Sequence, residues 1–157
     1  MEIFPKGFSK EAVDANGEAV KIIGMLAQGK TDGIEELYQP MLYHMGQHIS
    51  SQKKRLGGDM VIAQSIFSRK QRDSLRNIIG PDLVFIVLNM SNECQMQRLK
   101  NRHGNADAGW IKILNKFHEL SEPAEEDEEN AFNVNITDDM SPEYVLQKIL
   151  EIISKLK

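Results

Sequence analysis

Three short apolar runs in the second half of the chain predict β-strands. Asp59–Ala63 follows a pair of glycines and is apolar from its second residue onward, which indicates a buried strand. Leu83–Leu88 is apolar at every position, which is typical of a central strand in a parallel sheet. Phe132–Ile136 alternates strictly between apolar and polar residues, which also predicts a strand.

Helices are predicted between and after these strands, and several of them begin with a serine that can act as the N-cap residue. Ser68 and Gln71 have the spacing of a capping box, and the helix that they begin is expected to end at residues 80–81, a Gly-Pro pair. Ser91 is the expected N-cap of a helix that runs to about Arg102. Further helices are predicted for Trp110–Leu120 and after the Ser141-Pro142-Glu143 cap, where Val145, Leu146, Ile149, Ile152, Ile153 and Leu156 have helical spacing.

The first 58 residues have a less regular pattern. Residues 11–27 and 34–50 each suit a helix, and residues 1–4 suit a short strand. Alternation of strands and helices after residue 58 predicts an α/β fold, in which a small parallel sheet is flanked by helices on both faces. We therefore expect one domain over residues 1–157, with a divergent helical part over 1–58 and an α/β core over 59–157.

Polar residues follow each predicted strand, and the charge is unevenly distributed. In parallel sheets ligands bind beyond the carboxyl ends of the strands, which here are Gln64–Phe67, Asn89–Ser91 and Thr137–Asp139. Residues 53–103 contain ten Lys and Arg against four Asp and Glu, whereas residues 117–144 contain ten acidic residues and no Lys or Arg. This division suggests an anionic ligand near the middle of the chain. The alternative, favoured by charge alone, is that the two regions partly neutralise each other as solvated surface.

Length and composition set the broad class of protein. A chain of 157 residues with 41% hydrophobic and 27% charged residues has the composition of one soluble globular domain. The longest apolar run, Leu83–Leu88, is much shorter than a membrane span, and the N-terminus lacks the pattern of a signal peptide. The single cysteine, Cys94, fits a reducing compartment. We therefore expect a cytoplasmic protein with no membrane partner.

One segment matches the phosphate-loop motif G-x-x-x-x-G-K-[ST]. In residues 24–31 the motif places Gly29, Lys30 and Thr31 where main-chain amides, an ammonium and a hydroxyl hold phosphate and magnesium. The preceding Val20–Ile23 could be the short strand that such a loop requires. The alternative is that these residues continue a helix, since Ala19, Ile22, Ile23, Leu26 and Ala27 have helical spacing, and that Gly29 ends it.

Five segments occur in the order found in one known family. Val61–Arg76 is similar to a strand ending in C-S-A-L-K and a following Y-R-D-x-L-R helix, and Val84–Leu88 is similar to the next strand. Arg98–Gly104 is similar to the R-L-x-x-R-x-G that opens a lid, and Phe117–Pro123 to the F-x-x-L-x-x-P after it. Ser141-Pro142 fits the start of the last helix. Over about 100 residues the chain thus resembles the gluconokinase group of small-molecule P-loop kinases, relatives of shikimate and adenylate kinases.

The resemblance implies ATP-dependent phosphoryl transfer to a small hydroxylated substrate, typically a sugar acid, with ATP and Mg²⁺ as cofactors. By position, Arg98 and Arg102 would be catalytic lid arginines that neutralise the phosphates in the transition state. Ser65, Arg69 and Arg72 would bind the substrate. The simpler alternatives are that the arginines are solvated helix charges and that Ser65 is an ordinary hydroxyl at a strand end.

The nucleotide side of the resemblance is incomplete. The lid would lie near residues 98–110, and Thr137 and Pro142 would border the adenine, but the strand, phosphate loop and second strand that open the family have no counterpart here. The same register places Ala27–Gly29 on the A-S-G that ends a helix in the family. Two hypotheses follow: an ATP-dependent kinase, or a catalytically inactive or truncated homologue that is a ligand- or protein-binding module.

Three other sequence features give only weak evidence for a functional site. His44 and His48 are four residues apart, as metal ligands can be, but no third ligand is evident, so we expect no metal site. Cys94, near a helix start, is expected to fill the core, with mild reactivity as the alternative. The basic segment lacks interleaved aromatic residues, so we expect no nucleic-acid partner.

Overall fold

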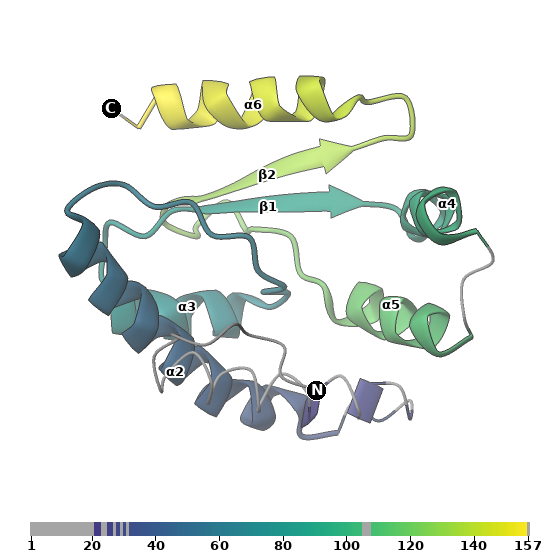
Figure 1. The fold of residues 1–157 in the computed structure, drawn as a ribbon, viewed down its shortest axis with the longest axis horizontal. Helices are drawn as coiled ribbons and strands as arrows, with labels where there is room; N and C mark the ends of the chain where they lie inside the picture. The colour runs from purple at the N-terminus through teal and green to yellow at the C-terminus, as the bar shows by residue number, and fades with distance from the viewer. Residues whose placement is uncertain are drawn as a thin grey trace. The chain divides into compact units, whose positions relative to one another are not determined.

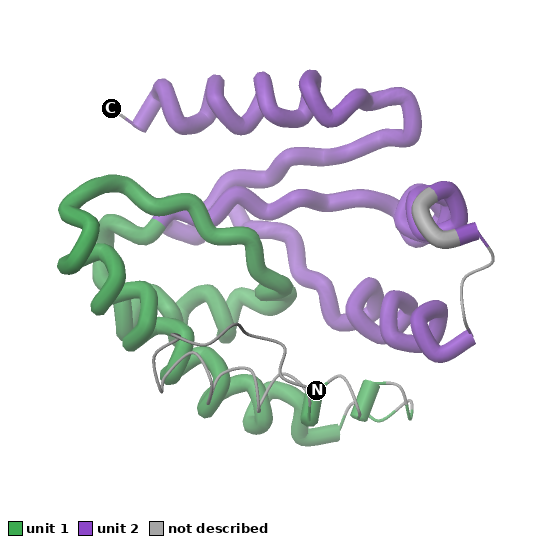
Figure 2. The backbone as a smooth tube through the Cα atoms, in the orientation of Figure 1, with its two compact units in different colours: residues 1–83 green, residues 84–157 purple. Residues whose placement is uncertain are grey.

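The computed structural model describes residues 21–22, 25–26, 28, 30, 32–104 and 108–156, without the side chains of Arg102 and His103. The chain divides into two compact units, residues 1–83 and 84–157 (Figure 2). Among the residues that the structure describes, no helix has both the length and the hydropathy needed to cross a membrane. Its main elements are α2 (Ile34–Leu56), α3 (Arg69–Ile79), β1 (Phe85–Met90), α4 (Asn92–His103), α5 (Ala108–Leu120), β2 (Ala131–Ile136) and α6 (Pro142–Ser154) (Figure 1).

The first unit is built around the packing of α2 against α3. The predicted helix over 34–50 is confirmed and extends to Leu56, where Gly57 adopts a φ of 67° and donates its N–H to the Lys53 carbonyl at 3.0 Å. The ring of Tyr38 meets that of Phe67 edge-on, with 4.8 Å between their centroids. Among the described residues of this unit, the buried apolar ones are Ile22, Leu26, Ile34, Tyr38, Met41, Leu42, Ile49, Phe67 and Leu75.

The N-cap predicted for α3 is confirmed, with one change in the reciprocal bond. The N–H of Gln71 donates to Ser68 Oγ at 3.2 Å. In a standard capping box the Gln71 side chain would accept from the N-cap residue itself, but here its Oε1 accepts from the N–H of Phe67 at 3.1 Å. The helix ends at Ile79, as predicted from the Gly80-Pro81 pair.

The strand predicted at 59–63 is wrong. Residues 57–67 contain no strand, and the side chain of Val61 is 94% exposed. An apolar run forms a strand only where a neighbouring strand accepts and donates its main-chain hydrogen bonds. Helix α3 packs with α2, so it belongs to the first compact unit.

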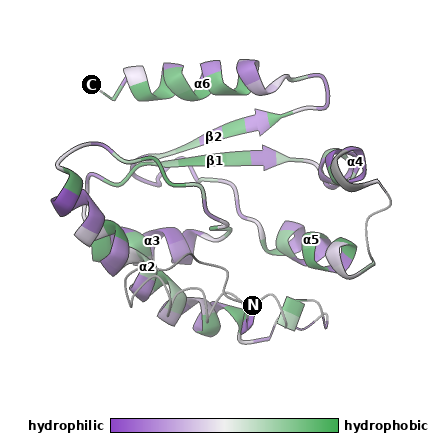
Figure 3. Cartoon of the chain, viewed as in Figure 1, coloured by the Kyte–Doolittle hydropathy of each residue, from purple (hydrophilic) through white to green (hydrophobic). Residues whose placement is uncertain are grey.

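The second unit contains a two-stranded parallel sheet. β1 lies two residues later than the predicted run, and β2 agrees with the predicted strand within one residue. Their register pairs Phe85 with Ala131 and Met90 with Ile136. The expected α/β class is therefore observed as a mixed α/β architecture, with two strands in the described residues rather than three. β1 is hydrophobic over most of its length (Figure 3).

Helix α6 packs on β2 and forms the core of the second unit. The buried residues Val134, Ile136 and Val145 are contacted by Ile86, Met90, Met140, Ile149 and Ile152. The predicted cap is confirmed, since the N–H of Tyr144 donates to Ser141 Oγ at 3.2 Å. The helical spacing also predicted that Leu146 belongs to the packed face, yet this side chain is 54% exposed. A two-stranded sheet is too narrow to cover the whole apolar face of α6.

Candidate functional site at the carboxyl edge of the sheet

The carboxyl ends of β1 and β2 lie side by side because the strands are parallel and Met90 pairs with Ile136. The segments that follow them, Ser91 into α4 and Thr137 into the turn before α6, therefore leave the sheet at the same edge (Figure 1). Ser91 caps α4 by accepting the N–H of Cys94 at 3.1 Å, as the sequence predicts. This edge is the candidate functional site of the second unit.

Arg98 connects α4 to the turn between β2 and α6. Its Nη2 donates to the carbonyl oxygen of Thr137 at 3.4 Å and to that of Met140 at 3.3 Å. The N–H of Met140 in turn donates to the Thr137 carbonyl at 3.2 Å, which closes the turn. One arginine thus satisfies two carbonyls in a segment that has no regular secondary structure.

Cys94 lies one helical turn before Arg98 and is 2% exposed. A hydrogen bond to the Asp138 carboxylate, burial and the charge of that carboxylate raise the pKa of the Cys94 thiol, and the nearby Arg98 opposes this only in part. The thiol therefore donates to Asp138 and is a poor nucleophile at neutral pH. Its position supports the expectation that Cys94 fills the core.

Carboxylates lie on both segments that leave this edge, Glu93 in the first turn of α4 and Asp138 and Asp139 after β2. Thr137 Oγ1 donates a short hydrogen bond to Asp139, and this bond lowers the pKa of the Asp139 carboxyl. Hydrogen bonds from its own main chain and from Ser91 lower the pKa of Glu93. The edge therefore carries several negative charges at neutral pH, and it can accept hydrogen bonds from the amino or hydroxyl groups of a ligand more readily than it can hold a triphosphate.

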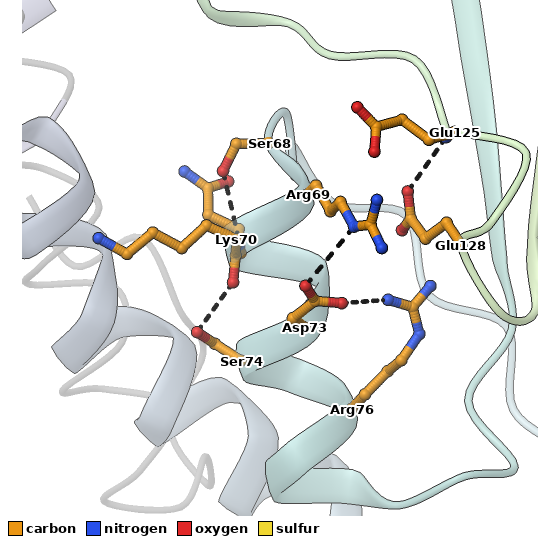
Figure 4. A network of polar contacts seen from close by, with 9 residues as sticks. Ser68, Arg69, Lys70, Asp73, Ser74, Arg76, Glu125 and Glu128 are labelled. Carbon is orange, nitrogen blue, oxygen red and sulfur yellow. Dashed lines mark hydrogen bonds and ion pairs between the residues drawn. The ribbon is translucent and has the colours of Figure 1, made fainter.

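The residues expected to bind the substrate lie in the first unit. Ser65 is exposed on the segment before α3. Arg69 and Arg76 share the carboxylate of Asp73, at 3.9 Å from Arg69 Nε and 2.7 Å from Arg76 Nη1 (Figure 4). Arg72 is 0% exposed, so its guanidinium is a buried group of this helical unit rather than a surface group that a substrate can reach directly.

The described part of the phosphate-loop match has the geometry of a helix end. Met25 and Leu26 are helical, and Leu26 is completely buried. The N–H groups of Gln28 and Lys30 both donate to the Met25 carbonyl at 3.0 Å, as in the C-terminal turn of a helix. A phosphate loop needs such amides to face the anion. The described residues of this segment therefore do not fit ATP and Mg²⁺; Gly29 and Thr31 lie outside them.

The structure brings together only part of the predicted set of site residues. Arg98 and Thr137 meet at the carboxyl edge, and Pro142 begins α6 just after this turn. The side chain of Arg102 lies outside the described residues. Sequence reasoning missed the role of Asp138, although its position at a strand end could have indicated it. In the parts of the chain that the structure describes, no group of three or more His, Cys, Asp or Glu side chains is arranged to hold a metal ion.

Comparisons of the chain with protein-family models, with curated proteins and with solved structures found no match.

Proposed function

We propose that this protein is a cytoplasmic, gluconokinase-like binding protein with the ancestry of a P-loop kinase. In this proposal it binds the adenine part of a nucleotide at the turn between β2 and α6 and does not transfer phosphate. The observation that carries the proposal is the bond of Arg98 to the carbonyls of Thr137 and Met140. The resemblance assigns this turn to the adenine and Arg98 to the phosphates.

The geometry supports a preformed turn more than a catalytic arginine. Arg98 Nη2 is already engaged by two carbonyls, so it positions main-chain groups next to the exposed side chains of Thr137 and Asp139. A turn held in this way loses little conformational entropy when a ligand binds. The carboxylates of Asp138 and Asp139 favour a ligand that presents N–H donors, such as the amino group of adenine.

Two features argue against phosphoryl transfer. The N–H of Lys30 is bonded to the Met25 carbonyl, so it does not point to an anion. Arg72, one of the arginines assigned to the substrate, is completely buried. Phosphoryl transfer depends almost entirely on positioned cationic and amide groups around the phosphates.

Isothermal titration of the full chain with ATP, ADP and adenosine, each with and without Mg²⁺, tests this proposal. We expect all three to bind with similar affinity and without dependence on Mg²⁺. The variant Arg98→Lys keeps the charge but cannot reach both carbonyls, so it should weaken binding about tenfold. The matched control Arg55→Lys changes an exposed arginine on α2 and should bind like the original chain.

Three results would contradict the proposal. If none of the three ligands binds at millimolar concentration, the adenine site is wrong. If Arg98→Lys binds as tightly as the original chain, the turn is not the site. If gluconate and Mg-ATP yield ADP at a rate above the uncatalysed background, the protein is an active kinase, and the proposal that it does not transfer phosphate is wrong.

A further inference from the structure

The side chain of Cys94 lies against residues 137–140, the turn that joins β2 to α6, and we call this segment the edge turn. Cys94 is 2% exposed, and its N–H donates to Ser91 Oγ at 3.1 Å, so its main chain is held at the start of α4. The thiol donates a hydrogen bond to the carboxylate of Asp138, the second residue of the edge turn. A reagent can therefore reach the thiol only if this part of the edge turn moves.

Arg98 holds the edge turn in place over this thiol. Residues four positions apart lie on the same face of a helix, so Arg98 projects from the face of α4 that carries Cys94. Its Nη2 donates to the carbonyls of Thr137 and Met140, which stand on either side of Asp138 in the sequence. The residue that covers the thiol is thus held on both sides by one guanidinium.

The contacts of the edge turn are weak enough for it to open by itself. The two bonds of Arg98 measure 3.4 and 3.3 Å, longer than the distance of about 2.9–3.0 Å that is most common for such bonds. Residues 137–139 are exposed and polar, and Met140 packs against the core beneath α6. Segments with few buried apolar contacts open at a lower free energy than the whole domain unfolds. The edge turn is such a segment.

We propose that the edge turn is a latch over Cys94, and that a nucleotide bound at this turn and a chemical group attached to Cys94 exclude each other. This inference rests on the proposed function, because the ligand is the one assigned to the same turn. A ligand that binds the closed turn blocks the path to the thiol, whereas a group attached to the thiol occupies the space next to Asp138 and keeps the turn open. Both act on one equilibrium between a closed and an open turn.

Iodoacetamide is a defined probe of this latch because the chain has a single cysteine. The sulfur attacks the CH₂ carbon of the reagent: an S–C bond forms, the C–I bond breaks, iodide leaves and the thiol proton passes to solvent. At sufficiently alkaline pH the thiol is fully ionised, and the alkylation rate reaches a plateau. The plateau then measures how often the turn is open rather than the pKa of the thiol. We expect it to be lower than the plateau of N-acetylcysteine.

The dependence of the plateau on urea distinguishes opening of the turn from unfolding of the chain. Opening of a short turn exposes little surface, so the plateau should change little at urea concentrations below the unfolding transition. A plateau that rises in proportion to the population of unfolded chain would overturn the latch, and so would a plateau equal to that of N-acetylcysteine.

The variant Arg98→Lys tests the latch without any ligand. Lysine keeps the positive charge but cannot bond to both carbonyls, so the turn should open more often and the plateau should rise about tenfold. Circular dichroism checks that the variant is folded. The matched control Arg55→Lys changes an exposed arginine of α2 and should have the plateau of the original chain. An unchanged plateau in Arg98→Lys would overturn the latch.

Adenosine tests the exclusion in both directions. When it is present during alkylation, the plateau should fall by the factor 1 + [L]/Kd, with the Kd measured by titration. A chain that has been alkylated and returned to neutral pH should bind adenosine at least about tenfold more weakly than the untreated chain. Cys94→Ser cannot be alkylated there, so its adenosine binding should be the same before and after treatment with the reagent.

The outcomes separate this inference from the proposed function. If adenosine does not bind the untreated chain, the proposed function is wrong, and the regulation inferred from it is wrong as well. If adenosine binds but leaves the plateau unchanged, or if the alkylated chain binds it as tightly as the untreated chain, the proposed site stands and the latch is wrong.

Discussion

Gly46 of α2 packs directly against Ile78 of α3. A Cβ atom added at Gly46 would lie 2.5 Å from Ile78 Cγ2 and 3.0 Å from Ile78 Cβ. These atoms are the branched base of the isoleucine rather than a flexible end, so they cannot move aside without a shift of the helix. The close approach of the two helices in the first unit therefore depends on the absence of a side chain at this position.

Gly46→Ala should destabilise the protein despite the better helix propensity of alanine. The propensity gain is at most about 1 kcal/mol, whereas overpacking a tight contact costs about 1–3 kcal/mol. Urea unfolding monitored by circular dichroism measures the difference. The control is Gly58→Ala, where an added Cβ meets nothing within 4 Å, and it should leave stability unchanged within error. Equal midpoints for the two variants would contradict the close packing.

Ser68→Ala should lower the free energy of unfolding by about 1 kcal/mol, because it removes the acceptor for the Gln71 N–H at the start of α3. The same measurement on Ser51→Ala gives the control, since Ser51 is exposed in the interior of α2, where alanine is slightly favoured over serine. If both variants have the same stability, Ser68 does not cap the helix.

Cys94 should react with thiol reagents only at alkaline pH. Asp138 and burial raise the pKa of the thiol, so the alkylation rate should reach half its maximum above the ordinary value for cysteine of about 8.5. Asp138→Asn removes the charge and should shift this midpoint to lower pH. Asp127→Asn, on an exposed position of the acidic loop, is the control and should not shift it.

The same thiol links stability to pH. Its pKa is raised in the folded state, so its contribution is fully present below about pH 8.5 and is lost as the pH rises through the higher folded value. The original chain should therefore lose more stability between neutral and alkaline pH than Cys94→Ser, which does not titrate. Parallel pH dependences of the two unfolding curves would contradict the assigned hydrogen bond.

Asn133→Ala should loosen the acidic loop before β2. The Asn133 side chain accepts the N–H of Ala124 at 2.8 Å and donates to its carbonyl at 2.7 Å. Ala124 is buried, so loss of this pair leaves main-chain groups unsatisfied at a cost of about 1–3 kcal/mol. Hydrogen exchange in residues 121–130 should become faster in Asn133→Ala and remain unchanged in Asn135→Ala. Unchanged protection in both would contradict this anchor.

Helix starts in this protein were predictable because their determinants are local. Ser68, Ser91 and Ser141 each accept an N–H from a residue three positions later, and all three were expected from sequence. A cap needs only neighbouring residues and a suitable backbone conformation, so three or four consecutive residues are enough to predict where the helix begins. The position of Thr137 at the carboxyl edge was predictable for a similar reason, because parallel strands must end at the same side of a sheet.

The candidate site was only partly predictable. Arg98 was selected through a resemblance, but its bonds to the carbonyls of Thr137 and Met140 join residues about 40 positions apart in sequence. The hydrogen bond of Cys94 to Asp138 could not be predicted for the same reason, because the two residues are also far apart in sequence. Contacts of this kind depend on which helix packs where, and residue type at one end does not specify the acceptor at the other.

The sequence by itself determined the helices after residue 33, the serine caps of α3, α4 and α6, the two parallel strands and the mixed α/β class. Only the tertiary structure decided that the apolar run at 59–63 is not a strand and that Leu88 and Leu146 are exposed. The physical reason is that a helix satisfies its main-chain hydrogen bonds within itself, whereas a strand and an apolar face need partners from distant parts of the chain. Whether such partners exist is a property of the packed molecule.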